Sequence, residues 1–404
     1  MTTAPKVRFL DRTSPPHIGT LILMAGFSAL VMNIFLPSLP GMAAYFKTDY
    51  RLMQLSVSLY LGTSAILQLF IGPVSDKFGR RPVVMGSLVL FLLATIGCIY
   101  ATTVEVFLLF RMGQTVIAAA MVLSRAVVRD IHPQDRAASM IGYVTMGMAL
   151  VPMAAPAFGG LLDQTFGWQS NFWLMLGLGA MLLALVWADQ GETAPKSGLS
   201  LGAQFGEYRE LLKSPRFWGY SVASGAASGA FFAYLGGAPF VGSEVFGMEP
   251  AMLGLFFGSP AIGYAAGNGL SGRYSMRFGI NRMILWGCFF GVLGISLPLI
   301  ALWLGAFSAL MFFGAMTFVG VGNGLVIPNA TAGMLSVRPH LAGTASGLGG
   351  SLMIGLGAAL SAFAGSVLTP ETGALPLLVI QMATSVVGLF AITFVIWRQS
   401  RAGI

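Results

Sequence analysis

The sequence predicts an all-α membrane protein with twelve transmembrane helices in two six-helix bundles. The first observation is composition: 56% of the 404 residues are apolar and 9% are charged, whereas an average soluble protein is about 25% charged. The second is that the apolar runs repeatedly reach the ~20 residues that cross a bilayer. The third is a single long polar stretch that divides these runs six and six. A soluble globular enzyme is therefore excluded.

Apolar segments follow one another along the chain, each bounded by charges, proline or glycine. We place them near residues 18–45, 52–75, 82–101, 104–129, 137–162, 171–188, 217–241, 251–271, 282–302, 306–329, 341–368 and 374–397. The long polar stretch runs from Asp189 to Arg216. We therefore expect an N-terminal bundle over residues 1–188, a cytoplasmic linker over 189–216 and a C-terminal bundle over 217–404.

The distribution of basic residues predicts the orientation of the chain. Of the 22 Lys and Arg residues, Lys47 and Arg51 lie between spans on one side and Arg111 lies inside a span. All the others lie on the side that holds both termini. Because basic loops remain cytoplasmic, both termini are predicted to be cytoplasmic. The first apolar run is too long for a cleaved signal peptide, so we interpret it as an uncleaved first span.

A short internal repeat supports the six-plus-six division. Residues 72–81 read GPVSDKFGRR, and residues 272–281, at an offset of 200, read GRYSMRFGIN. Both copies fall between the second and third predicted spans of their half, which favours duplication over chance. Asp76 and Arg80 have no counterparts in the second copy. The two halves are therefore predicted to share a fold and to differ in chemistry.

Several motifs in this chain match those of a known family. The stretch Gly72 to Arg81 resembles the loop motif of the major facilitator superfamily with high specificity, Arg111 to Gln114 resembles its fourth-span motif, and Gly147 to Pro152 with Pro156, Gly159 and Gly160 resembles the fifth-span motif of its antiporters. Segments similar to the Bcr/CflA group of bicyclomycin and chloramphenicol resistance exporters are 124–130, 167–168, 237–241 and 342–346.

This resemblance implies a multidrug or small-molecule exporter with two bundles, a central cavity of alternating access, and proton antiport. The expected partners are a small-molecule substrate, the lipid bilayer and protons. We expect a monomer without cofactor, metal or nucleic acid, and no enzymatic activity. The alternative on the same fold is an importer, exchanger or uniporter of a small organic anion bound by Arg111. A membrane receptor or scaffold without transport activity is a third possibility.

Charged residues of the predicted loop motif form the first set of candidate gating residues. Gly79 permits a tight turn, and Asp76 can cap a helix or pair with Arg125 or Arg129. Arg80 can pair with Asp130. When such contacts break and reform, they can shift the balance between two conformations of the protein. The alternative is that these charges only set the orientation of the chain.

The fifth span supplies the second set of candidate gating residues. Pro152 and Pro156 remove backbone hydrogen bonds, and Gly159 lets another helix approach closely. Individually such residues are ordinary in membrane helices. Their combined spacing favours a hinge or a packing role.

Arg111 is the only residue predicted to carry charge near the middle of the bilayer, about seven residues, or ~10 Å, from the start of its span. Ionisable groups at such depth are functional by default. A guanidinium suits a carboxylate, sulfonate or phosphate, so Arg111, with Asn33 and Gln114, is a candidate substrate site. The alternative is that Asn33, Gln114 and backbone carbonyls satisfy Arg111 structurally.

Asn33 is a departure from the family, because many Bcr/CflA proteins have an aspartate in this part of the first span. An amide cannot bind and release a proton in the physiological range. The acids left as proton carriers are peripheral, chiefly Glu105 and Glu244.

Aromatic and methionine side chains complete the predicted substrate site. Residues that would line a cavity between the bundles are Met146, Phe231, Tyr234, Phe257 and Tyr264. Such side chains adapt to varied apolar ligands. The alternative is that they face lipid or a neighbouring helix.

The predicted orientation can be tested by labelling. In a variant in which Cys98 and Cys288 are replaced by alanine, a cysteine introduced at Thr48 or Thr372 should react with a membrane-impermeant maleimide in intact cells. A cysteine at Ser197 should react only after permeabilisation, because it lies in the predicted cytoplasmic linker. Labelling of position 197 in intact cells would overturn the orientation.

Overall fold

The structure is a computed structural model that describes residues 7–131, 140, 144, 151, 154–193, 209–338 and 342–402, apart from the side chains of residues 73, 76, 129, 342–344, 346 and 402. The described residues form helices and connecting turns, with no β-strand among them. The prediction of an all-α fold is therefore confirmed.

The first half of the chain contains a series of long helices and short helical turns. They are α1 (Ile18–Asn33), the 3₁₀ turn η1 (Leu36–Ser38), α2 (Leu39–Tyr45), α3 (Tyr50–Phe78), α4 (Arg80–Ile99), α5 (Val104–Gly113), the 3₁₀ turn η2 (Gln114–Ile117), α6 (Ala118–Ile131) and α8 (Gln169–Asp189). Two predicted spans are divided. The first breaks where Pro37 and Pro40 begin new helical turns, and the fourth tightens into η2 after Gly113.

The second half has a similar order of elements. They are α10 (Pro215–Phe240), the π-helical turn η3 (Val241–Val245), α11 (Pro250–Phe257), α12 (Ser259–Phe278), α13 (Ile280–Trp303), α14 (Ala309–Val337), α15 (Ala342–Val367) and α16 (Leu375–Ala402). Hydroxyl side chains cap the starts of two of these helices: Ser214 accepts from the backbone N–H of Phe217, and Ser308 accepts from that of Met311.

Nine helices among the described residues are long and apolar enough to cross a bilayer. Two further predicted spans, 217–241 and 251–271, correspond to α10 and to α11 with α12, whose glycines lower their hydropathy. The predicted span 137–162 lies largely outside the described residues.

The two copies of the repeat fold alike, although they are not loops. Helix α3 continues to Phe78 and α12 continues to Phe278, so the prediction of a loop across 72–81 and 272–281 is wrong for most of each motif. The chain turns only at Gly79 and Gly279, whose φ angles are 99° and 82°. This left-handed region is one that glycine adopts without a steric penalty.

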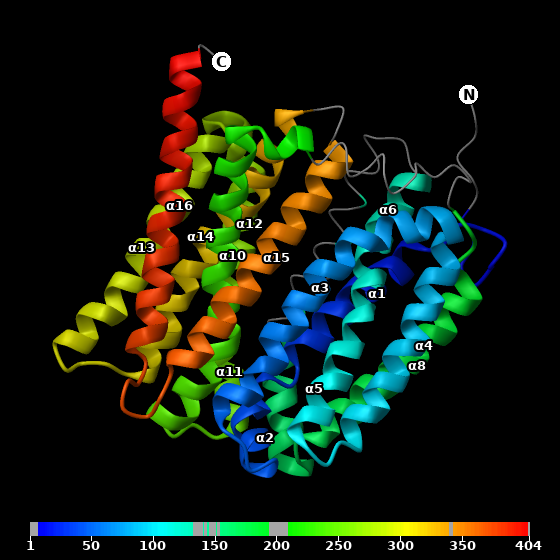
Figure 1. The fold of residues 1–404 in the computed structure, drawn as a ribbon, viewed down its shortest axis with the longest axis horizontal. Coiled ribbons are helices and arrows are strands. Elements are labelled where there is room, and N and C mark those ends of the chain that lie inside the picture. Colours follow the sequence, from blue (N-terminus) through cyan, green and yellow to red (C-terminus); the bar gives the residue numbers. More distant parts are fainter. Residues whose placement is uncertain are drawn as a thin grey trace.

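Helices of each half pack mainly on one another, and the two groups meet at one end of the molecule (Figure 1). We call this the distal end, because the described N-terminal residues and the last turn of α16 lie at the opposite, terminal end. Contacts between the halves join α3 to α15, α10 to α2 and η1, and α11 to η1. From these contacts the two groups of helices diverge toward the terminal end (Figure 1).

The buried core follows the same division. One apolar cluster runs through the first half and continues into the distal part of the second half, where it includes Tyr234, Phe312 and Phe313. A separate cluster, around Phe217 and Ile284, fills the terminal part of the second half. The halves therefore share a core only toward the distal end. The exact domain boundaries stay a prediction.

Candidate functional site

Arg111 lies in the middle of the first half and is closed off from solvent. Its residue is 1% exposed. The centre of the guanidinium is 4.3 Å from the ring centroid of Phe35 and 4.2 Å from that of Tyr60. Both distances are within the range of a cation–π contact, which is strongest when the cation is desolvated. The charge is thus held between two aromatic rings supplied by the first and second spans.

Two hydrogen bonds fix the plane of this guanidinium. Nη1 donates to Oε1 of Gln114 at 2.6 Å, and Nη2 donates to the carbonyl of Val31 at 3.1 Å. Gln114 in turn donates to the hydroxyl of Thr95 at 2.7 Å. Among the described residues, Nε of Arg111 has no hydrogen-bond partner. These hydrogen bonds connect α1, α4 and η2, so Arg111 and Gln114 help to hold the helices of the first half together.

Asn33 does not hydrogen-bond Arg111 in this structure, so of the groups in the structural alternative only Gln114 and a backbone carbonyl bind the guanidinium. Its Nδ2 donates to the carbonyl of Ala29, one turn earlier in its own helix, at 2.7 Å. Its Oδ1 is buried without a partner. An amide near the end of a helix often bonds its own backbone in this way. The substrate role predicted for Asn33 remains a prediction.

The predicted aromatic residues separate into two environments. Tyr234 and Phe257 are buried, with ring centroids 4.9 Å apart and the Tyr234 hydroxyl donating to the carbonyl of Phe257 at 3.1 Å. Phe231 and Tyr264 are only half-buried. Met146 lies outside the described residues. The structure therefore packs two of the predicted cavity residues into the distal core.

Arg125 on α6 and Tyr264 on α12 belong to opposite halves of the chain and interact electrostatically. The charge of the Arg125 guanidinium on α6 acts electrostatically on the Tyr264 hydroxyl on α12. Both side chains are half-buried. The sequence assigned Arg125 to gating and Tyr264 to substrate binding.

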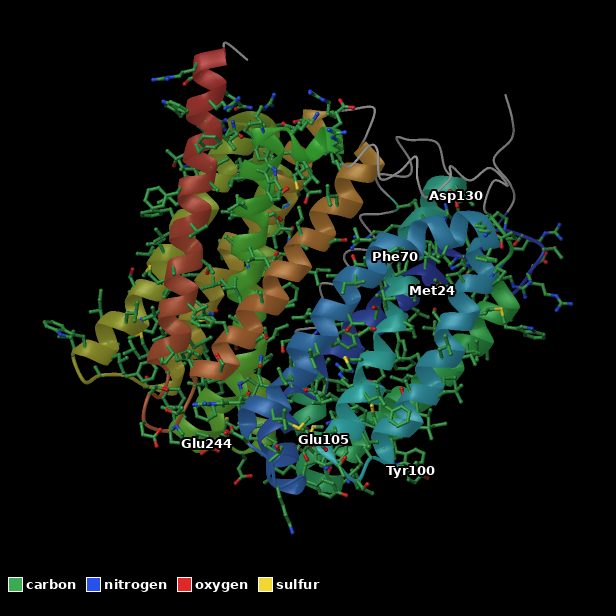
Figure 2. All side chains as sticks on the ribbon, in the orientation of Figure 1. Met24, Phe70, Tyr100, Glu105, Asp130 and Glu244 are labelled. Carbon is green, nitrogen blue, oxygen red and sulfur yellow. The ribbon has the colours of Figure 1, made fainter. Side chains whose placement is uncertain are left out.

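At the terminal end of the first half, Arg80 and Asp130 form the expected ion pair. Nε of Arg80 lies 3.0 Å from Oδ2 of Asp130, and Nη1 of the same residue donates to the Ser75 hydroxyl. Asp130 marks this end in Figure 2. The contact joins the start of α4 to the end of α6. Whether it gates the protein remains a prediction, and the Asp76 side chain lies outside the described residues.

Glu192, which the sequence placed in the linker, caps the start of α4. Its carboxylate accepts from the backbone N–H of Arg80 at 2.8 Å and from that of Arg81 at 3.2 Å. An anion at a helix N-terminus is stabilised by the unpaired amides and by the helix dipole. The only sequence signal was a glutamate shortly after a span, which did not identify its partner.

Asp189 is a second functional candidate that sequence reasoning missed. Its fully buried carboxylate accepts from the backbone N–H of Leu10 at 2.7 Å, from that of His17 at 2.8 Å, and from the Thr20 hydroxyl at 2.6 Å. The end of α8 therefore holds the described N-terminal segment in place.

The fifth-span motif lies where the halves touch at the distal end. A Cβ on Gly159 would collide with the carbonyl of Ile34, and one on Gly160 would collide with that of Pro250 in the other half. Gly254 is equally close to the carbonyl of Pro156. Pro156 and Gly159 are thus packing residues in this structure, and Pro152 lies outside the described residues.

Two hydrogen-bonded side chains at the start of α3 complete this junction. The Tyr50 hydroxyl donates to the carbonyl of Gly236 at 2.7 Å. Nε2 of Gln54 donates to the carbonyl and to the hydroxyl of Ser361 at 2.6 and 2.9 Å. We call these contacts the distal latch. Neither Tyr50 nor Gln54 stands out in the sequence, because their partners are distant along the chain.

The environment of Arg111 predicts an order of stability among its variants. Arg111→Lys should lower the midpoint of thermal unfolding in detergent, because a buried ammonium loses the planar pair of hydrogen bonds, each worth about 1.5–3 kcal/mol. Arg111→Met should lower it less, because methionine leaves no uncompensated charge. Arg51→Lys, at an exposed position, is the matched control. A midpoint for Arg111→Lys equal to that of the control would contradict the packing role.

Comparison with known proteins agrees with this architecture. The sequence profile of the Major Facilitator Superfamily matches residues 21–362. The chain is 30% identical to a chloramphenicol resistance protein of Pseudomonas aeruginosa over 388 residues, 93% of this chain and 90% of that one. It is 27% identical to a bicyclomycin resistance protein homolog of Haemophilus influenzae over 391 residues, 95% and 96% of the two chains.

A solved structure shares the fold at low sequence identity. The crystal structure of the peptide transporter POT in complex with alafosfalin superposes with a TM-score of 0.75 over 94% of both chains at 14% identity. With the profile match across most of the chain, these similarities establish the family. The chain is a multi-pass membrane transporter of the Major Facilitator Superfamily, with drug-resistance proteins of the Bcr/CflA type among its relatives.

Proposed function

We propose that the protein exports small amphipathic molecules across a bacterial inner membrane by alternating access, as a monomer with both termini in the cytoplasm. The observation that carries this proposal is the position of the contacts between the halves. The distal latch and the close approaches at Gly160 and Gly254 all lie toward one end. With the termini in the cytoplasm, this arrangement corresponds to a conformation closed to the outside.

The chemistry of the distal latch suits a contact that opens and closes. Tyr50, Gln54 and Ser361 are uncharged, and a net hydrogen bond is worth only about 0.5–1.5 kcal/mol. A few such bonds between close-packed backbones can be exchanged for another set at small cost. Two conformations that differ by a few kcal/mol are what a transporter requires.

Polar contacts at the terminal end support the same proposal. The ion pair of Arg80 with Asp130 lies within the first half, and that of Arg338 with Glu210 joins the predicted linker to the end of α14 in the second half. Neither of these two ion pairs joins one half to the other. In the alternate conformation the terminal ends of the halves would approach each other, with Gly79, Arg80, Arg125 and Asp130 placed to take part.

The named relatives favour an amphipathic substrate over a simple anion. Two relatives carry names of resistance to chloramphenicol and bicyclomycin. Arg111 is closed off between Phe35 and Tyr60, so direct binding of an anion there would need a rearrangement. Arg125 and Tyr264, one from each half, would offer a donor and an aromatic surface to a substrate with hydrogen-bond acceptors.

Proton antiport needs a carboxylate that binds and releases protons. Position 33 cannot supply one, because it is an asparagine in this chain. Glu105 and Glu244 are both exposed at the distal end (Figure 2). Asp163 is half-buried in the helical residues 154–166 of the fifth span, near the Ser38 hydroxyl, which accepts from Nδ2 of Asn171 at 3.1 Å. We therefore propose Asp163 as the proton-carrying group, since it lies near the junction that opens and closes.

Locking the distal latch tests alternating access. A double variant with cysteines at Gln54 and Ser361 should form a disulfide on mild oxidation and lose transport, because the disulfide holds the distal end closed. Reduction should restore transport. Each single cysteine variant is a control that oxidation leaves unchanged. Full transport by the oxidised, cross-linked protein would show that the distal end need not open.

Flux and proton movement can be measured together in proteoliposomes that contain a pH-sensitive dye. Chloramphenicol, bicyclomycin, a lipophilic cation and a small organic anion form the substrate panel. We expect flux of an amphipathic drug with counter-movement of protons, which Asp163→Asn abolishes and Glu105→Gln leaves unchanged. Drug flux without proton movement in the wild type would exclude antiport. Flux of the organic anion alone would replace the proposed exporter with an anion carrier.

A further inference from the structure

An open groove lies on the outside of the second half, between α10 and α16 near the terminal end. It has a volume of about 610 Å³, which is within the ~300–1,000 Å³ range of small-molecule sites. Its walls are apolar, with Trp218 and Val222 on one side and Phe390 and Phe394 on the other. Lys213 is its one charged lining residue. The groove is thus apolar along its length and basic at one end.

The shape of the groove is built into the packing of its two helices. Nε1 of Trp218 donates to the carbonyl of Leu212 at 2.8 Å, which fixes the indole as one wall. At Gly219 the helices approach so closely that a Cβ would collide with the Val395 side chain. Phe390 is 72% exposed although it lies beside this contact. The close contact of α10 with α16 at Gly219 therefore forms the floor of the groove, and the projecting aromatic side chains form its walls.

Helical periodicity places a second cation at the basic end. Val387, Phe390 and Phe394 recur on one face of α16, and Arg398 follows Phe394 by one turn on that face. Lys213 comes just before the first residue of α10. Within the described part of the chain, neither Lys213 nor Arg398 forms an ion pair. Two cations without carboxylate partners therefore lie at the same end of an apolar groove.

We propose that this groove binds an anionic glycerophospholipid from the leaflet at the terminal end of the protein. The acyl chains would lie against Trp218, Phe390 and Phe394, and the phosphate would lie between Lys213 and Arg398. An ammonium or guanidinium near a membrane surface attracts anionic lipid by about 1 kcal/mol per residue. A phospholipid with net negative charge matches both parts of the groove.

Charge argues against a second copy of this chain as the occupant. A symmetric pair that met across α10 and α16 would bring Lys213 and Arg398 of each copy close to those of the other, and like charges at an interface are unfavourable. The site also lies away from the contacts between the halves. It therefore goes beyond the transport function proposed above.

The test uses the purified, full-length protein in detergent with short-chain lipids. A lipid that binds the folded state raises the midpoint of thermal unfolding in a saturable way. We expect dioctanoyl phosphatidylglycerol to half-saturate this rise at a clearly lower concentration than dioctanoyl phosphatidylcholine. Lys213→Gln should raise the half-saturating concentration of phosphatidylglycerol about fivefold, as the loss of one cation implies. Val387→Trp should fill the groove and abolish the effect of both lipids.

Arg51→Gln, which removes an exposed cation at the start of α3, at the distal end of the first half, should respond like the wild type. Equal responses to the two lipids, or an unchanged response in Lys213→Gln, would overturn the proposal. A dimer in light scattering that Val387→Trp dissociates would also overturn it in favour of a second copy. If Val387→Trp does not fold, Lys213→Glu takes its place, and it should remove the preference for phosphatidylglycerol.

Discussion

Close approach of backbones at glycine is the constraint on which this architecture depends. In lipid, apolar side chains gain little from leaving one apolar surface for another, so helices associate largely through tight packing at small residues. Gly159 packs on the carbonyl of Ile34 within the first half, while Gly160 and Gly254 pack on carbonyls across the halves. These approaches decide where the halves touch. The position of the proposed pathway, and of its closed end, follows from them.

Charge in the interior is handled in a different way in each part of the molecule. Arg111 lies between two rings and uses two of its hydrogen-bond donors, while its Nε has no partner. Arg80 is neutralised by Asp130 at the terminal end. A cation held by rings stays charged through a cycle, whereas an ion pair near water can exchange partners. The contacts of Arg111 are thus those of a packing residue, while the gating role of Arg80 and Asp130 remains a prediction.

More of the fold than of the candidate site could be predicted from the sequence. Hydropathy predicted the spans, and the repeat predicted matching turns, because Gly79 and Gly279 need a backbone conformation that few other residues adopt. The pairing of Arg80 with Asp130 was also within reach, since motif charges on one side of the membrane are few. The contact of Gln54 could not be predicted, because its partner lies 307 residues away and a single glutamine in a span forms no recognisable sequence pattern. The role of a residue such as Gln54 depends on contacts between helices that are far apart in the sequence.

The anchoring of the N-terminal segment to Asp189 has a consequence for how the protein is handled. Residues before the first span are usually the part that is trimmed or replaced by an affinity tag. A protein that begins at Ile18 would lose the amides of Leu10 and His17, leaving the Thr20 hydroxyl as the one remaining donor of the three. A buried carboxylate stripped of its donors is costly. A tag is therefore better placed after the end of α16.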